Sequence, residues 1–351
     1  MAKVTPLAEI HAELDAKFIP YNGWKMPQNY PGGILTELKH AEQHCSVIDF
    51  SCSGKIRIAG NGCAEALDTI FMYQVSALEC GQTGQNCLLA DNGCFIDFVT
   101  VFRMDTEDFF VITSGNCLQN VLERLKGLLP DTIQLQDLTE VIAEIDLPGE
   151  EAEDVLIEAE ADPEKLPASG RCGIVEIAGI RCIISAANQL SNSGFELFCG
   201  ADNAIDLWDE LTCIEPVRPV GLAARDALRI AMKSCAFGTE FTAALTPVDC
   251  GLEIPARKFA GSEALQGKTA EYTLVFAEFD SKQPPFAGDK IKLSSGEEIG
   301  TVCSAAAFAT RGKSGAICRI KKLSDGVSGK QVIAFREQKE QCGEVISECF
   351  C

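Results

Sequence analysis

The stretch Asp91–Arg103 constrains the fold most, because it joins a tight turn to a hydrophobic strand. Asn92-Gly93 is a strong short-range signal for a β-hairpin turn. The residues after the turn are mostly β-branched or aromatic, which is typical of a half-buried strand. One carboxylate, Asp97, interrupts this run. Because burying an unpaired ionised carboxylate is costly, Asp97 either faces water or serves a chemical role.

Helix and strand patterns alternate around this hairpin. Helical spacing occurs at residues 62–71 and 116–125, and strand patterns occur at 55–60 and 109–113. Such a helix–strand succession within about 80 residues is typical of an α+β unit. From about residue 251 the pattern changes to short strands separated by turn residues, which predicts a separate all-β domain.

Two other segments carry specific expectations. Residues 19–33 are dense in Pro, Gly and Asn, so we expect an irregular loop that nevertheless buries Trp24, Met26 and Tyr30. Arg225 and Arg229 are four residues apart on a predicted helix and therefore share a face. That face is either a solvated charged surface or a pair of guanidinium groups aimed at an anion.

The composition excludes several classes of partner. The chain has 351 residues and a formal charge of −21, and so acidic a surface disfavours nucleic acid and anionic membranes. No secretory signal or transmembrane run is recognisable, so a cytoplasmic location is expected. The 18 cysteines include no Cys-x-x-Cys pair, and we expect them to act mainly as small, reduced, buried apolar groups.

The catalytic inventory is limited. Only three histidines are present, and neither a dinucleotide nor a Walker fingerprint occurs, so no metal site is predicted. Carboxylates, arginines and aromatic side chains are left. This combination suits a flat, polar, aromatic ligand that ends in an acid, because carboxylates accept paired N–H donors and arginine binds acidic groups.

Several motifs occur in a fixed order along the chain. They are Thr5-Pro-Leu7, Gly23-Trp-Lys-Met-Pro27, Asp49-Phe-Ser51, Asn92-Gly93 with Ile96-Asp97, Gly194-Phe-Glu-Leu197, Gly221-Leu-Ala-Ala-Arg-Asp-Ala-Leu-Arg229, Thr246-Pro247 with Gly251-Leu252, and Phe259-Ala-Gly-Ser-Glu-Ala-Leu265. In this order they resemble the aminomethyltransferase family, the T-protein of the glycine cleavage system, and its folate-dependent relatives. The resemblance covers nearly the whole chain.

The resemblance implies an α+β, three-domain fold. Residues 1–54 plus 139–250 would form a discontinuous folate-binding core, 55–138 an inserted α+β domain with the hairpin, and 251–351 an antiparallel, barrel-like β domain. The implied reaction belongs to glycine catabolism. It transfers an aminomethyl group from the lipoyl arm of H-protein to tetrahydrofolate, with release of ammonia, so tetrahydrofolate and lipoylated H-protein are the implied cofactor and partner.

The resemblance also implies site residues. Glu196 matches the glutamate that holds the pterin, and Arg225 matches the arginine near the acidic end of folate. The full set of candidate ligand-binding residues is Glu196, Arg225, Gln85, Phe98, Phe102 and Gln189. Gln85 and Gln189 stand where the family has tyrosines.

The candidate catalytic acid lies in the opening stretch. The family's second strand aspartate, which lies beside the reacting nitrogen, matches Phe98, and the acid available here is its neighbour Asp97. Strand alternation turns Asp97 to the opposite face unless a bulge intervenes. Two functions therefore stay open: an active aminomethyltransferase, or a non-catalytic folate-binding, regulatory or interaction member of the family.

Overall fold

The computed structural model of the chain describes residues 2–186, 189–323, 326–337 and 339–349. Contacts divide the chain into two compact units. Unit 1 comprises Met1–Leu88 and Val99–Arg225, and unit 2 comprises Leu89–Phe98 and Asp226–Cys351. Among the described residues, no helix is both long and apolar enough to span a membrane.

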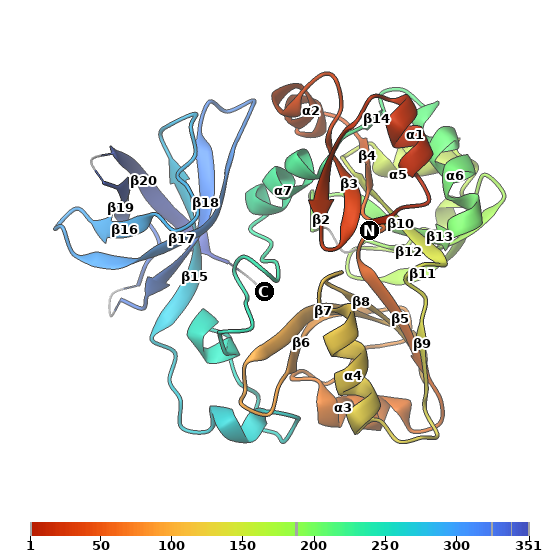
Figure 1. The fold of residues 1–351 in the computed structure, drawn as a ribbon, viewed down its shortest axis with the longest axis horizontal. Helices are drawn as coiled ribbons and strands as arrows, with labels where there is room; N and C mark the ends of the chain where they lie inside the picture. The colour runs from red at the N-terminus through yellow and green to blue at the C-terminus, as the bar shows by residue number, and fades with distance from the viewer. Residues whose placement is uncertain (1, 187–188, 324–325, 338, 350–351) are drawn as a thin grey trace. The chain divides into compact units, whose positions relative to one another are not determined.

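Three sheets lie wholly or largely in unit 1 (Figure 1). The six-stranded sheet has the order β11 (Cys172–Ile177), β12 (Ile180–Ser185), β13 (Gly194–Gly200), β10 (Ile142–Pro148), β4 (Ser46–Asp49), β14 (Arg218–Pro219). The five-stranded sheet has the order β6 (Thr83–Leu89), β7 (Phe95–Asp105), β8 (Asp108–Thr113), β5 (Gly54–Ala59), β9 (Gln134–Asp137). The three-stranded sheet has the order β1 (Lys3–Val4), β3 (Trp24–Asn29), β2 (Lys17–Tyr21).

Seven α-helices occur in the described residues. They are α1 (Ala8–Glu13), α2 (Ile34–Ala41), α3 (Cys63–Ile70), α4 (Leu118–Leu128), α5 (Ala152–Glu158), α6 (Ala204–Thr212) and α7 (Leu222–Ala231). Apolar side chains of α5 and α6 pack against alternate residues of β10, including Ala143, Ile145 and Leu147. This packing buries one face of the six-stranded sheet and leaves the opposite face for the candidate site.

Unit 2 contains a closed antiparallel barrel, which Figure 1 shows in cyan to dark blue. Its order is β15 (Tyr272–Phe279), β18 (Ser314–Lys321), β17 (Glu298–Ala307), β16 (Lys290–Leu293), β19 (Gln331–Arg336), β20 (Lys339–Glu348). Val275, Ile317 and Val332 are among its buried apolar residues. The mixed α+β fold with a C-terminal barrel confirms the predicted fold class. The three domain boundaries stay a prediction, since contacts divide the chain into two units.

The predicted hairpin is present. β6 and β7 are neighbours in the five-stranded sheet, and Ala90 N donates a hydrogen bond to Cys94 O across the turn, 2.9 Å. Gly93 has a φ of +81°, and a Cβ there would lie 2.8 Å from the Leu265 side chain. Glycine therefore meets both a backbone and a packing requirement at this turn.

The expectation of an irregular loop at 19–33 is wrong. β2 and β3 pair in antiparallel fashion, and the turn between them is Asn22-Gly23, with φ values of +49° and +83°. Positive φ at both turn residues is the geometry that Asn-Gly favours in hairpins. Trp24 and Met26 are nevertheless buried, as expected.

Most of the described cysteines are buried and free, as expected of small apolar groups. Cys45, Cys63 and Cys182 are buried, and burial raises the pKa of each thiol to about 12. They therefore stay protonated near neutral pH.

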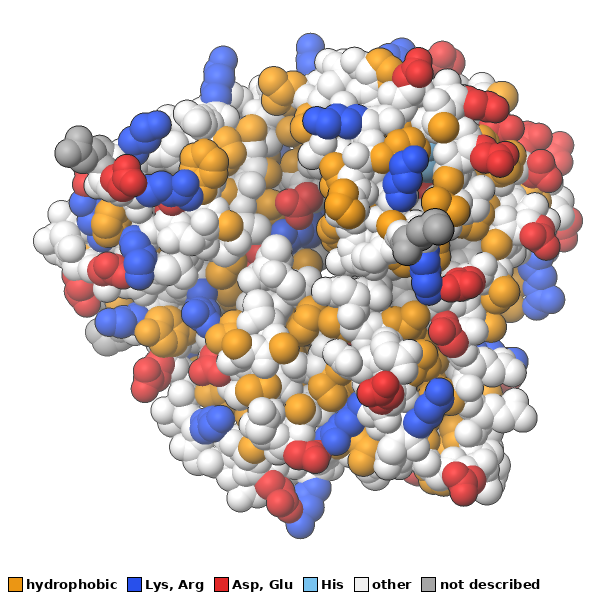
Figure 2. All heavy atoms as spheres, in the orientation of Figure 1, with side chains coloured by type: hydrophobic (Ala, Val, Ile, Leu, Met, Phe, Trp, Pro, Cys, Tyr) orange, Lys and Arg blue, Asp and Glu red, His pale blue; other side chains and the backbone are white. Residues whose placement is uncertain are grey.

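Acidic side chains gather over part of the surface. Figure 2 shows them most densely at the upper right, where Figure 1 labels α6. Asp206, Asp209 and Glu210 of this helix are exposed. The charge of −21 thus includes a concentrated patch on unit 1.

Candidate functional site

Two adjacent strands place acidic side chains on the face of the six-stranded sheet that α5 and α6 do not cover. Side chains alternate along a strand, so Glu144 and Asp146 of β10 point away from the face that α5 and α6 cover. Asp146 is directly opposite Glu196 of β13 in the strand register. Because opposed residues point to the same face, Asp146 and Glu196 are cross-strand neighbours.

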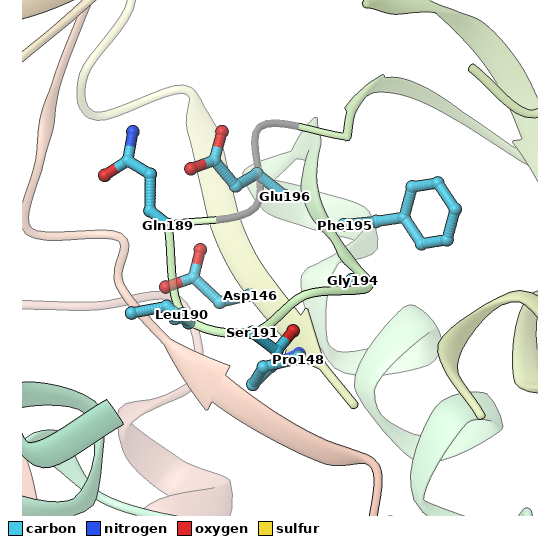
Figure 3. A pocket seen from close by; sticks show the side chains of 8 residues that line it. All are labelled: Asp146, Pro148, Gln189, Leu190, Ser191, Gly194, Phe195 and Glu196. Carbon is cyan, nitrogen blue, oxygen red and sulfur yellow. The ribbon is translucent and has the colours of Figure 1, made fainter. Parts of the chain in front are cut away.

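Asp146 and Glu196 line a small pocket of about 20 Å³, room for one or two water molecules, that is partly open to solvent. The full lining is Asp146, Pro148, Gln189, Leu190, Ser191, Gly194, Phe195 and Glu196. Figure 3 shows the Asp146 and Glu196 carboxyl groups and the Gln189 amide extending to the same side, while the Phe195 ring points away. The pocket is therefore rich in hydrogen-bond acceptors.

Arg225 is already paired inside unit 1. Its Nε donates a hydrogen bond to Asp146 Oδ2 at 2.7 Å, and the side chain is only 14% exposed. The guanidinium carbon lies 3.3 Å from the centroid of the Phe50 ring, which adds a cation–π contact. Arg225 thus neutralises Asp146 instead of presenting an unpaired charge.

Lys55 is the cationic partner of Glu144, as Arg225 is of Asp146. Its side chain is fully buried, and Nζ donates hydrogen bonds to Ser51 O at 2.8 Å and Ser53 O at 3.0 Å. Lys55 Nζ lies 3.8 Å from Glu144 Oε2, and Ser53 Oγ donates to that same carboxylate oxygen. The cluster therefore contains three carboxyl groups and two buried cations.

The three carboxyl groups titrate abnormally. Burial, partly offset by Lys55, raises the pKa of Glu144 to about 7. Burial also raises the pKa of Asp146, against the opposing effect of Arg225. Burial, and then the charges of Asp146 and Glu144, raises the pKa of Glu196 well above its usual range. The site therefore holds bound protons at a pH where solvent-exposed carboxyl groups have lost them.

We expect the stability of unit 1 to fall as the pH rises from 5 to 8. A carboxyl group with a raised pKa binds more protons in the folded state, so stability is lost between the unfolded value of about 4.5 and the folded value of about 7 for Glu144. The loss from this group should be about 2 kcal/mol. Urea unfolding followed by fluorescence is suitable, because both tryptophans, Trp24 and Trp208, are buried in unit 1.

The matched variant is Glu144→Gln. It lacks this titrating group, so its free energy of unfolding should depend less on pH than that of the wild type. A wild-type stability that rises from pH 5 to pH 8, or an unchanged slope in the variant, would contradict the assignment.

Asp97 and Phe98 occupy opposite faces of β7. Asp97 is 0% exposed, and its Oδ1 accepts a hydrogen bond from Phe98 N at 2.9 Å. The Phe98 ring is half-buried and packs against Phe241 of unit 2 at a centroid distance of 4.6 Å. The burial pattern alternates from Phe95 to Thr100, which places Asp97 on the buried face and Phe98 on the other.

The other predicted ligand residues are dispersed. Gln189 lines the pocket, and its Nε2 donates to Thr100 Oγ1 at 3.4 Å. Phe102 is fully buried, with its ring centroid 5.6 Å from that of Phe198. Gln85 is half-buried on β6. The structure therefore brings Glu196 and Gln189 together at the pocket and places Phe102 in an aromatic cluster.

Sequence reasoning missed Glu144, Asp146 and Lys55. A usable signal was present, because Glu144 and Asp146 are two acids spaced by two residues within an otherwise apolar strand. Their buried cationic partners lie 89 and 79 residues away along the chain, so no local pattern could have revealed them.

Comparisons with known proteins show the family and the fold. The sequence model described as the GCVT N-terminal domain matches residues 7–258. An aminomethyltransferase of Chloroherpeton thalassium is 29% identical, covering 98% of this chain and 97% of its own length. One of Geobacillus kaustophilus is 27% identical, covering 86% of each chain. The crystal structure of the glycine cleavage system aminomethyltransferase T from Bartonella henselae superposes with a TM-score of 0.87 at 25% identity, covering 99% of this chain and 97% of that one.

Proposed function

Because the chain belongs to the GCVT N-terminal domain family, we propose that it binds a reduced folate, with the pterin ring against Glu196. The proposed reaction is transfer of an aminomethyl group from the lipoyl arm of an H-protein to that folate, with release of ammonia. The observation that carries the proposal is the cross-strand pair at this pocket, in which half-buried Glu196 lies beside a buried acceptor, Asp146.

The residues of the pocket fit the head of such a ligand. A pterin presents adjacent N–H donors, and carboxyl groups on neighbouring strands offer the matching acceptors. The structure gives less support for binding of the acidic tail of the folate to Arg225, because Arg225 Nε already donates a hydrogen bond to Asp146. A tail carboxylate bound there would have to share the guanidinium group or use its other N–H donors.

One observation favours a second candidate, a non-catalytic folate-binding or regulatory protein. Phe98 occupies the position that the resemblance assigns to the family's second strand aspartate, and Asp97 is buried on the opposite face of β7. A phenyl ring can neither accept nor donate a proton. A protein of this second kind would bind the folate but would not catalyse the aminomethyl transfer.

Two measurements separate the candidates. Calorimetry with tetrahydrofolate should detect binding that weakens by about 10- to 100-fold in Glu196→Gln, since the glutamine amide replaces one of the two carboxyl oxygens with an NH₂ donor. Glu158→Gln, an exposed position on α5, is the control and should bind like wild type. Ammonia release with aminomethyl-loaded H-protein then tests the reaction. Binding without ammonia supports the second candidate, and absence of folate binding contradicts both.

A further inference from the structure

A groove lies between α1 and α6 on the surface of unit 1. It has a volume of about 530 Å³ and is partly open to solvent. In both helices the lining residues form pairs four positions apart, so each helix turns one face to the groove. The full lining is Glu9, Ile10, Glu13, Leu14, Ile205, Trp208, Asp209, Thr212 and Pro219.

Buried contacts hold the two helices together beneath the groove. The rings of Trp208 on α6 and His11 on α1 meet edge-on with centroids 5.2 Å apart, and both side chains are buried. His11 in turn shares hydrogen bonds of 3.0 Å with the side chains of Asp49 and Tyr30. The groove is therefore preformed, and a partner would lose little affinity to ordering it.

The groove exposes large apolar side chains. Leu14 is 40% exposed and Ile205 is 37% exposed, and Ile10 and Pro219 beside them are half-buried. Single exposed apolar side chains are ordinary on a protein surface, but several that share one groove with a tryptophan indicate a contact surface.

Carboxylates flank these apolar side chains. Glu9 and Glu13 on α1 and Asp209 on α6 are exposed, and in the part of the chain that the structure describes none of the three forms an ion pair. The nine lining residues include no Lys or Arg. Figure 2 shows further acidic side chains gathered over α6. The groove is therefore apolar within and negatively charged at its edges.

This combination selects one kind of occupant. An amphipathic helix lays its apolar face into a groove of this type, and Lys or Arg at the margins of that face would meet the carboxylates. A second copy of the chain is a poor occupant, because two molecules that each carry a charge of −21 repel one another.

We infer that the groove between α1 and α6 docks a basic amphipathic helix of a protein partner. This inference goes beyond the proposed function and does not depend on it. α6 covers the face of the six-stranded sheet opposite to Glu144 and Asp146, so a helix docked in the groove would leave the Glu196 pocket free.

The test uses two synthetic peptides and the full chain. The first is a blocked helical peptide of about 14 residues with leucines along one face and lysines elsewhere. The second has the same composition and charge, with its leucines distributed around the helix. Calorimetry should show the amphipathic peptide binding at least about tenfold more tightly. The second peptide controls for the attraction of any cation to a chain with a charge of −21.

One pair of variants tests the apolar part of the groove. Leu14→Gln combined with Ile205→Gln should weaken binding of the amphipathic peptide at least about tenfold, because two exposed aliphatic side chains no longer bury against it. Ile157→Gln is the control, since Ile157 lies on α5 and is also 40% exposed. It should bind like wild type.

A second pair of variants tests the carboxylates. The groove variant combines Glu9→Gln, Glu13→Gln and Asp209→Asn, and the control combines Glu153→Gln, Asp154→Asn and Glu158→Gln at exposed positions of α5. Both variants change the net charge equally. The groove variant should bind the amphipathic peptide about tenfold more weakly than the control.

Equal binding of the two peptides would overturn the inference, as would groove variants that bind no more weakly than their α5 controls. Self-association of the wild-type chain in sedimentation, abolished by Leu14→Gln with Ile205→Gln, would also overturn it, because a second copy would then occupy the groove. A failure of tetrahydrofolate binding would leave these results unaffected, so the inference and the proposed function can fail separately.

Discussion

Glu240→Ala is expected to lower the unfolding free energy by about 3–5 kcal/mol, because it breaks a fully buried ion pair. Glu240 is 0% exposed in unit 2, and its Oε2 accepts from Arg229 Nη1 at 3.0 Å, Ala236 N at 2.9 Å and Thr239 Oγ1 at 2.6 Å. Ser304 Oγ of the barrel donates to the other oxygen. Removing the carboxylate leaves Arg229 with the Asp226 carboxylate and the Ser234 carbonyl as partners, and leaves the donors on Ala236, Thr239 and Ser304 without this acceptor.

Urea unfolding followed by circular dichroism measures the loss. Glu240→Gln keeps an acceptor and the shape, so it should lose less than Glu240→Ala. Glu298→Ala is the control in the same unit, because the Lys290–Glu298 pair is exposed and should contribute less than about 1 kcal/mol. Equal effects of Glu240→Ala and Glu298→Ala would show that the buried network does not stabilise the fold.

Arg229 illustrates what spacing along a helix can predict. The four-residue interval correctly placed Arg225 and Arg229 on one helix, α7. Neither interpretation of that face was right, since each guanidinium group pairs with an internal carboxylate, Asp146 for Arg225 and Glu240 for Arg229. A helical pattern predicts which side chains share a face, but the partners of that face depend on tertiary packing.

The hairpin at Asn22-Gly23 shows a different limit. The same dipeptide correctly predicted the turn at Asn92-Gly93, where apolar strands flank it. At residues 19–33 the density of Pro and Gly led to the prediction of a loop despite the Asn-Gly turn signal. The structure nevertheless has a strand there, β3, which includes Pro27. Specific turn chemistry was therefore more informative than average composition.

The candidate site was predictable only in part. Glu196 and Gln189 were found through motifs, and the structure places both at one pocket. Asp146 and Asp97 share one sequence signal, since each is a carboxylate within an otherwise apolar strand. Its register opposite Glu196 depends on pairing between strands about 50 residues apart, which no local pattern specifies.

Phe98→Asp is expected to raise the rate of ammonia release by about 100- to 10,000-fold over wild type, the range that a positioned acid or base contributes. Phe98 lies on the strand face that also carries Thr100, and its ring is only half-buried. A carboxylate at this position would therefore be accessible, unlike Asp97, which is buried on the other face and bonded to Phe98 N. The assay uses aminomethyl-loaded H-protein and tetrahydrofolate at saturating concentrations.

Phe98→Asn is the matched control, because it loses the same contact with Phe241 and has nearly the same size as aspartate but cannot transfer a proton. It should stay at the wild-type rate, as should Asp97→Asn if that variant folds, which circular dichroism would establish. Equal rates in Phe98→Asp and Phe98→Asn would mean that position 98 does not serve the reaction. If tetrahydrofolate binds equally well to all of these proteins while only Phe98→Asp gains activity, Phe98 separates a ligand-binding member of the family from a catalytic one.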